Sequence, residues 1–285
     1  MRLGTLITGS GPRAVAQRGD ELVELPGSVR ELIAAGPDAA RRAYEAATAG
    51  HPFDPSRLGP AVPDPGKVLC IGRNYVDHVQ ELGGSEPPGK PEVFMRARTS
   101  LAGPYQPVHR PRVSEMMDWE VELAVIIGRR GRYTPASEAL EHVGGYCVFN
   151  DISLRDFQNF GRQWTPGKNF DGSGPLGPFV VTSDEVPDPF DLDLSTVLID
   201  GDGTERVMQS SNTSLMVHRI PNLIAFISLF ATLEPGDVIA TGTPGGVGLG
   251  RTPPVWMTPG QTVLCRIETL GDLKNQVLEE PGART

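Results

Sequence analysis

The stretch that decides the fold reads Met117-Asp118-Trp119-Glu120-Val121-Glu122-Leu123-Ala124-Val125-Ile126-Ile127-Gly128. As a strand it sends Glu120 and Glu122 to one face and Trp119 and Val121 to the other, because side chains alternate along a strand. Further along, both faces become apolar, which indicates a buried strand. The two carboxylates, about 7 Å apart at Cα by strand rise, either lie in solvent before the strand becomes buried or enter a pocket together. A pocket would require a compensating cation or proton.

Most of the chain beyond residue 93 consists of short apolar or alternating runs separated by turn residues. We predict strands at 121–127, 145–149, 179–181, 196–199, 238–241 and 262–267. Helices are few, and the clearest is 220–233, where apolar residues recur at helical spacing. The absence of repeated βαβ alternation disfavours a doubly wound sheet or a TIM barrel. The pattern favours a β-rich sandwich or roll.

The first sixty residues predict a small β/α unit. Apolar pieces at 3–7 and around 22–25 indicate strands, and a helix is expected near 29–47. Five prolines between residues 51 and 67 favour an extended connector. We therefore expect a small N-terminal domain at 1–60 and a larger one at 67–280, which begins with a strand at 68–72 and a short helix at 74–82.

Composition limits the kind of partner. The 285 residues carry 35 acidic and 26 basic side chains, a net charge of −9, which gives no footprint for nucleic acid or an anionic membrane. Three scattered cysteines, Cys70, Cys147 and Cys265, form no CxxC pair, so we expect a reducing, cytoplasmic location. The first residues lack the apolar core of a signal peptide, and the longest apolar run is shorter than the ~20 residues of a membrane helix. A small-molecule partner is expected.

Asp151 supplies a third carboxylate, at the end of the apolar run Gly145-Tyr146-Cys147-Val148-Phe149-Asn150. Three carboxylates without neighbouring cysteine or histidine form an all-oxygen donor set, which favours Mg²⁺ or Mn²⁺, with Ca²⁺ as a further option, over zinc. Alone, Asp151 also fits a turn residue or helix N-cap.

His78 and Glu81 are three residues apart and would share one helical face. A carboxylate in that place can orient an imidazole that takes a proton from water. The alternative is an exposed pair on a solvated helix.

Two glycine-rich stretches fail the nucleotide-binding patterns. Residues 241–250 lack a Lys-Ser/Thr step and are followed by Pro253-Pro254, which excludes the helix of a P-loop. Residues 167–172 lack the same spacing, although Lys168 could meet an anionic substrate. Gly-x-Ser-x-Gly and HExxH motifs are absent from the sequence.

Taken together, these motifs resemble those of the fumarylacetoacetate hydrolase family, in the family's order over residues 67–280. The motifs that carry the resemblance are Ile71-Gly72-Arg73-Asn74-Tyr75 with His78 and Glu81, Glu120-x-Glu122, Gly144-Gly145-Tyr146 leading to Asn150-Asp151, Arg155-Asp156-Phe157-Gln158, Lys168-Asn169-Phe170-Asp171, Pro235-Gly236-Asp237, and Thr241-Gly242-Thr243-Pro244-x-Gly246-Val247-Gly248.

The resemblance implies a β-rich α+β fold, a mixed β-sandwich roll, in a homodimeric enzyme. It also implies a divalent cation, usually Mg²⁺, on residues matching Glu120, Glu122 and Asp151. By motif position, His78 and Glu81 resemble a catalytic pair on a lid, and Lys168 joins them as catalytic. The positions that resemble substrate contacts are Arg73, Tyr75, Arg155, Gln158 and Thr243.

The predicted activity is metal-dependent hydrolysis of a carbon–carbon bond in a β-diketo acid of the acylpyruvate or fumarylpyruvate type, as in aromatic catabolism. The alternatives are decarboxylation of oxaloacetate, isomerisation and decarboxylation of an unsaturated 2-oxo dicarboxylate, and a catalytically silent binding protein. One departure from the family pattern concerns substrate choice. Many members have Phe-x-Lys-Pro where this chain reads Phe94-Met95-Arg96-Ala97, and a forked guanidinium is not equivalent to an ammonium.

Overall fold

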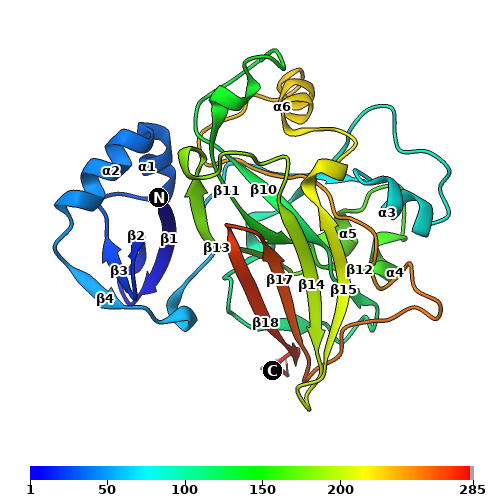
Figure 1. The fold of residues 1–285 in the computed structure, drawn as a ribbon. Helices are drawn as coiled ribbons and strands as arrows, with labels where there is room; N and C mark the ends of the chain where they lie inside the picture. Colours follow the sequence, from blue (N-terminus) through cyan, green and yellow to red (C-terminus); the bar gives the residue numbers. More distant parts are fainter. Residues whose placement is uncertain (283–285) are drawn as a thin grey trace.

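Two large sheets dominate the computed structural model, which describes residues 1–282 (Figure 1). The eleven-stranded sheet has the order β4 (Gly50–Pro52), β3 (Glu21–Glu24), β2 (Gly11–Arg18), β1 (Arg2–Thr8), β13 (Gly174–Thr182), β11 (Val143–Asn150), β10 (Val121–Ile127), β16 (Val238–Ala240), β5 (Val68–Gly72) and β6 (Glu92–Arg96), with β7 (Leu101–Ala102) beside β13. The five-stranded sheet has the order β15 (Glu205–Asn212), β14 (Asp193–Ile199), β17 (Thr262–Ile267), β18 (Gly271–Glu279) and β8 (Val108–Arg110). A small ladder pairs β12 (Ser153–Leu154) with β9 (Met117–Asp118).

The helices are short and lie around the sheets. They are α1 (Val29–Ala35), α2 (Pro37–Ala46), α3 (Val76–Glu81), α4 (Arg155–Gln158), α5 (Thr165–Lys168) and α6 (Ile220–Ser228). Single 3₁₀ turns occupy η1 (Pro55–Arg57), η2 (Arg98–Ser100), η3 (Ala139–His142), η4 (Ser183–Glu185) and η5 (Thr213–Leu215). The predicted β-rich α+β roll is confirmed: mixed sheets prevail, helices are few, and the sheets of residues 1–282 do not close into a barrel.

Strand β10 is buried on both faces, as its sequence predicts. Leu123 and Val125 belong to the core that includes Leu194 and Val263 of the five-stranded sheet. Ala124 and Ile126 belong to a second core that also contains side chains of the N-terminal helices. The strand lacks a solvent face because each side of it is covered by a different layer.

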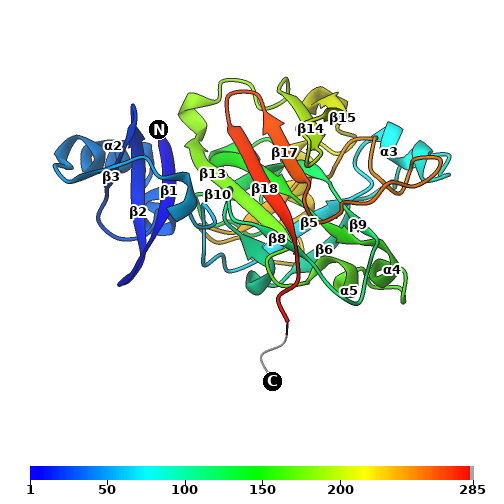
Figure 2. The same cartoon turned by 90° about the horizontal axis from the view of Figure 1, so that it is seen from below.

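The N-terminal unit extends the large sheet instead of standing apart from it. Strand β1 pairs antiparallel with β13, with Leu3 opposite Val180, and Figures 1 and 2 show this blue unit along one side of the molecule. The strand at 11–18 was not predicted from the sequence, yet β2 pairs with β1 along its length. A boundary between residues 60 and 67 stays a prediction.

Two helices differ from expectation. The predicted helix 29–47 is divided into α1 and α2, because Gly36 adopts φ 84° and Pro37 starts the second helix without an N–H to continue the first. Helix α6 ends at Ser228, not near 233, because Leu229 N–H donates to Phe226 O in a tightened last turn. Leu233 N–H then donates to Gly131 O, outside the helix.

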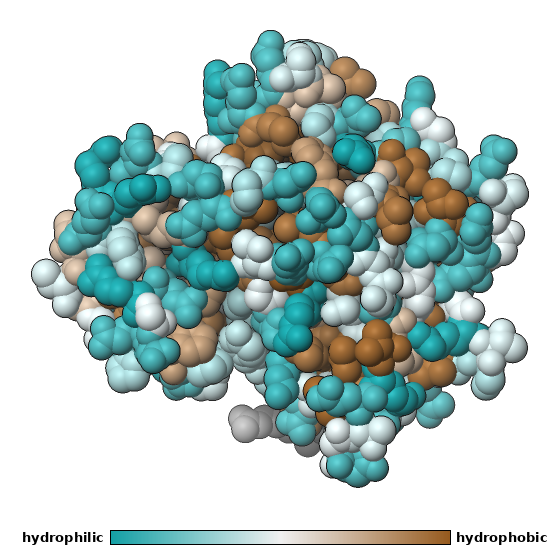
Figure 3. Space-filling model, in the orientation of Figure 1, coloured by the Kyte–Doolittle hydropathy of each residue, from teal (hydrophilic) through white to brown (hydrophobic). Residues whose placement is uncertain are grey.

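The surface carries no single apolar belt on the face drawn in Figure 3, where hydrophobic side chains form separate patches among hydrophilic ones. Across residues 1–282, every helix is too short or too polar to cross a membrane.

Candidate active site

Antiparallel pairing brings the three predicted carboxylates together. Val121 of β10 is opposite Asn150 of β11, so the residues just outside this pair, Glu120 and Asp151, are neighbours, and Asp151 N–H donates to Glu120 O at 2.9 Å. One ligand oxygen from each of Glu120, Glu122 and Asp151 lies within 4.8 Å of the others, and all three side chains are buried. The alternative of two glutamates in solvent does not hold in this structure.

Three buried cations surround this acidic cluster. Lys168 Nζ donates to Glu120 Oε2 and Asp151 Oδ2, each at 2.6 Å, and to Asp151 O at 3.1 Å. Arg96 holds the other carboxylate oxygen of Asp151. Arg155 Nη2 forms an ion pair with Glu120 Oε1 at 2.7 Å.

The pKa values of Glu120 and Glu122 shift in opposite directions because the cations are unevenly placed. Burial opposes ionisation of Glu120, but Lys168 and then Arg155 outweigh it and lower the pKa of Glu120 to about 2. Burial, with Asp151 and Glu120 as negative neighbours, raises the pKa of Glu122 well above its usual value. Its carboxylate accepts one hydrogen bond, from Gly242 N–H at 2.9 Å. Glu122 is therefore the acid that most lacks a positive partner.

This donor set fits a hard divalent cation. Buried carboxylate oxygens at mutual ligand spacing are the donors that Mg²⁺ and Mn²⁺ prefer. Burial, with the negative charges of Asp151 and Glu120, raises the pKa of Glu122, and a bound divalent cation would offset these effects. The residues that would hold the ion are Glu120, Glu122 and Asp151.

His78 and Glu81 form a buried pair rather than a solvated one. His78 Nδ1 lies 2.7 Å from Glu81 Oε1, and His78 is 5% exposed. The second oxygen, Glu81 Oε2, accepts from Gly246 N–H at 2.7 Å. Glu81 thus orients the imidazole and fastens α3 to the glycine-rich loop, which we define as residues 242–250.

A cavity of about 650 Å³ joins these groups. It is lined by Ile71, Gly72, Arg73, His78, Glu81, Leu82, Phe94, Glu120, Glu122, Asp151, Arg155, Gln158, Asn159, Trp164, Lys168, Thr243 and Leu249. The acid cluster, the imidazole and the lysine therefore face one space that can hold a small anionic molecule.

Four of the five predicted substrate contacts, Arg73, Arg155, Gln158 and Thr243, line this cavity. Arg73 is paired with Glu92, and Gln158 Oε1 accepts from Arg155 Nη1 at 3.0 Å. Thr243 Oγ1 already donates to Val121 O, at 3.0 Å. The fifth residue, Tyr75, is fully buried outside the lining, and its hydroxyl has no hydrogen-bond partner within residues 1–282.

Arg96 lies behind the site and braces Asp151. Its guanidinium also donates to Ser100 Oγ at 3.2 Å and to Ser173 Oγ at 2.5 Å, and the side chain is fully buried. Each of the three guanidinium nitrogens therefore donates at least one hydrogen bond within the protein. A lysine at this position would leave some of these acceptors unpaired.

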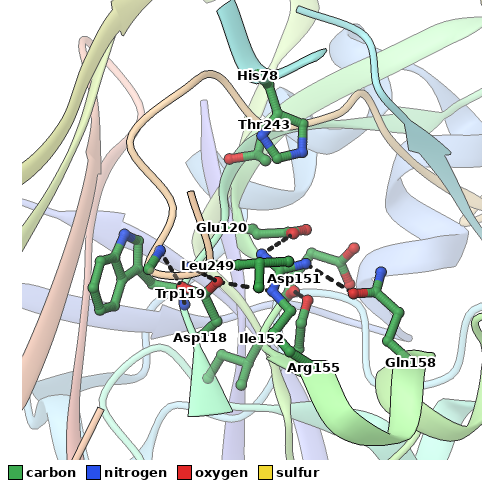
Figure 4. Close-up of polar contacts among 12 residues, drawn as sticks. His78, Asp118, Trp119, Glu120, Asp151, Ile152, Arg155, Gln158, Thr243 and Leu249 are labelled. Atoms are coloured by element: carbon green, nitrogen blue, oxygen red, sulfur yellow. Dashed lines mark hydrogen bonds and ion pairs between the residues drawn. The ribbon is translucent and has the colours of Figure 1, made fainter. Parts of the chain in front are cut away.

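Three residues near the site escaped the sequence reasoning. Asp118 binds Arg155 Nε at 2.8 Å, as Figure 4 shows. Gln209 of β15 donates to Thr243 Oγ1 at 2.8 Å and accepts from Val121 N–H at 3.1 Å. Trp164 packs against Gly72 and meets the Phe94 ring edge-on, with centroids 5.3 Å apart. Asp118 stood in the quoted motif, but nothing in the local pattern distinguishes Gln209 or Trp164.

A mixed β-roll whose cavity joins a buried acid cluster to a His–Glu pair defines a class of enzymes that act on small molecules and use divalent cations. The family model described as fumarylacetoacetate (FAA) hydrolase C-terminal matches residues 67–278, and the chain belongs to this family.

Individual relatives carry several activities. The chain is 44% identical over 241 residues to the human mitochondrial protein oxaloacetate tautomerase FAHD2B, covering 84% of this chain and 75% of that one. Among solved structures, fumarylacetoacetate hydrolase from psychrophilic Exiguobacterium antarcticum is 34% identical with a TM-score of 0.84, covering 98% of this chain and all of that one. The 5-carboxymethyl-2-hydroxymuconate delta-isomerase from Mycobacterium smegmatis is 32% identical with a TM-score of 0.78 and the same coverage.

Proposed function

We propose that this protein is a divalent-cation-dependent enzyme that moves a proton at the carbon beside the 2-oxo group of a β-oxo acid. Its reaction would be keto–enol interconversion of a substrate like oxaloacetate, the activity in the human relative's name. The observation that carries the proposal is the shared cavity: a buried imidazole oriented by a carboxylate faces the same space as the acid cluster and Lys168. This replaces carbon–carbon hydrolysis as the first candidate.

The chemistry divides between the cation and the side chains. Mg²⁺, with Mn²⁺ or Ca²⁺ as alternatives, would be held by Glu120, Glu122 and Asp151 and would act as a Lewis acid on the 2-oxo group. Removing the adjacent proton places negative charge on that oxygen. The ammonium of Lys168 lines the cavity where this charge would develop, so it stabilises the enol form.

His78 is the group suited to take the proton. When its Nδ1–H donates to Glu81, Nε2 is the basic nitrogen, and the carboxylate stabilises the imidazolium that forms. Return of the proton from the imidazolium to carbon or oxygen completes the interconversion and regenerates the neutral ring.

Hydrolysis of an acylpyruvate is the second candidate. The same imidazole can activate a water, and a cavity of about 650 Å³ lies in the range for drug-sized ligands, more than a four-carbon acid needs. Decarboxylation would use the same charge stabilisation without a water.

The test is a substrate panel with purified protein and Mg²⁺: oxaloacetate, followed by enol absorbance, then acetylpyruvate, fumarylpyruvate and a hydroxymuconate-type dicarboxylate. His78→Ala should lower the rate on the preferred substrate by about 10²–10⁴-fold, as expected for loss of a general base. Its Mg²⁺ affinity should stay near that of the wild type, because His78 is not a proposed ligand.

The matched control is His109→Ala, which removes an exposed imidazole on β8, in the other sheet. It should leave the rate unchanged. The proposal is wrong if His78→Ala turns over every substrate at the wild-type rate, or if the wild type with Mg²⁺ enolises none of them.

A homodimer and a cytoplasmic location stay predictions. The human relative, by its name, is a mitochondrial protein.

A further inference from the structure

Asp118 is a fully buried aspartate whose carboxylate bonds two neighbouring parts of the site, Arg155 and the glycine-rich loop. Its Oδ1 accepts from Trp119 N–H at 2.9 Å and Gly248 N–H at 2.7 Å. Its Oδ2 accepts from Leu249 N–H at 3.0 Å and Arg155 Nε–H at 2.8 Å. Figure 4 shows Asp118 between Trp119 and Arg155.

On one side, Asp118 determines how Arg155 is placed. The guanidinium donates Nε to Asp118 and Nη1 to Gln158, while Nη2 pairs with Glu120. Because Asp118 and Gln158 hold two other nitrogens of the guanidinium, the position of Nη2 is fixed. Asp118 thereby fixes the orientation of the Glu120 carboxylate that pairs with Nη2.

On the other side, the Asp118 carboxylate accepts hydrogen bonds from two backbone N–H groups of the glycine-rich loop. Gly248 permits this approach because a Cβ there would lie 1.9 Å from Val255 O and 2.7 Å from Asp118 Oδ1. Two residues earlier, the same loop donates Gly246 N–H to Glu81, and Trp119 Nε1 donates to Gly246 O at 3.2 Å. The loop is thus bonded to Asp118 and Trp119 on one side and to helix α3 on the other.

We propose that Asp118 is a positioning residue that couples the cation site to the glycine-rich loop and, through Gly246, to the His78–Glu81 pair. The inference rests on the cation binding of the proposed function. The Asp118 carboxylate bonds both Arg155, which pairs with Glu120, and the loop amides. A bound cation that orders Glu120 is therefore expected to order the loop as well, and an ordered loop is expected to favour cation binding.

Asp118→Asn tests this with little change of shape. An amide keeps one accepting oxygen but turns an NH₂ group toward two of the four donors, whichever way it is oriented. Mg²⁺ dissociation constants, measured by calorimetry on metal-free protein, should rise by about 10–100-fold, the usual range for partners of metal ligands. The amides of Gly246, Gly248 and Leu249 should exchange hydrogen faster, while those of β17 exchange as in the wild type.

Asp156→Asn is the matched control. Asp156 is on the same short helix as Arg155, and its Oδ1 accepts from Ser114 Oγ at 2.6 Å and Phe157 N–H at 3.0 Å. The variant removes the same charge, keeps an accepting oxygen for both hydrogen bonds, and does not touch the Arg155 guanidinium or the loop. Its Mg²⁺ dissociation constant should stay within about twofold of the wild type.

The outcomes separate the two proposals. If the wild type binds no Mg²⁺, both the proposed function and this inference fail. If the wild type binds Mg²⁺ but Asp118→Asn matches Asp156→Asn in affinity and loop exchange, only the inference is overturned. If Asp118→Asn does not fold, the wild type decides: adding Mg²⁺ should slow exchange at Gly246, Gly248 and Leu249, and unchanged exchange would overturn the coupling.

Discussion

Replacing Lys168 by methionine should have opposite effects on cation binding and on turnover. The ammonium occupies the space between Glu120 Oε2 and Asp151 Oδ2, at 2.6 Å from each, so it competes with a divalent ion for the same oxygens. Once Glu122 has lost its proton, as it must to bind a cation, four buried carboxylates, Asp118 and the three predicted ligands, face three buried cations, Arg96, Arg155 and Lys168. This leaves a local charge of −1 on the side chains (three minus four). Lys168→Met makes this −2.

The magnitude follows from Coulomb's law. Two unit charges 4 Å apart interact by about 4 kcal/mol at an effective dielectric constant of 20. In the wild type, Lys168 can relieve much of that repulsion by moving aside when Mg²⁺ binds. The variant therefore gains only part of it, and we expect a gain in binding free energy of at least about 1.4 kcal/mol, or tenfold tighter Mg²⁺ binding. Without metal the variant should lose stability, by less than the roughly 3–5 kcal/mol of a broken buried pair, because Glu120 keeps Arg155 and Asp151 keeps Arg96.

Calorimetry and thermal melts check both signs. The variant should bind Mg²⁺ more tightly than the wild type and show a larger rise in melting temperature between chelator and saturating Mg²⁺. Turnover should nevertheless fall by about 10²–10³-fold, since the group that stabilises the developing charge is gone. Lys274→Met, at an exposed position of β18, is the control and should change neither property. Equal or weaker Mg²⁺ binding by Lys168→Met would refute the reasoning.

Four further expectations can be checked directly. Glu120→Ala should abolish Mg²⁺-dependent activity while circular dichroism shows a retained fold; normal turnover after chelation and return to Mg²⁺ would contradict the ligand assignment. Because the pKa of Glu122 is raised in the metal-free protein, Mg²⁺ binding should release a proton and strengthen as pH rises toward that pKa, above the range of an ordinary glutamate; calorimetry showing an affinity independent of pH from about pH 5 upward would be the contrary result. Trp164→Ala should raise KM by about tenfold for an acylpyruvate with a bulky acyl group and leave oxaloacetate nearly unaffected, because the Trp164–Phe94 wall is apolar; equal effects on both would count against that role. Sedimentation should show a particle of twice the 30.6 kDa chain mass, and a concentration-independent monomer would reject the dimer.

The sequence by itself determined the strands and helices in which apolar or paired side chains recur at a regular spacing. Strand β10 was predictable because apolar side chains occupy both of its faces, and α3 because His78 and Glu81 stand at helical spacing in a segment closed by glycines. The three carboxylates were found for the same reason, since each lies beside an apolar strand that has to be buried. The family motifs added which of these residues belong to one site.

Tertiary structure alone decided how the charges are shared. The partners of Asp118 include Gly248 and Arg155, 130 and 37 residues away, and Gln209 reaches Thr243 from another sheet. Such pairings depend on strand register and sheet packing, which local periodicity does not encode. Strand β2 was missed for a related reason: its short apolar centre becomes a strand because β1 and β3 flank it in the extended sheet. Periodicity reports whether a side chain is buried, whereas the fold determines which charged group it meets there.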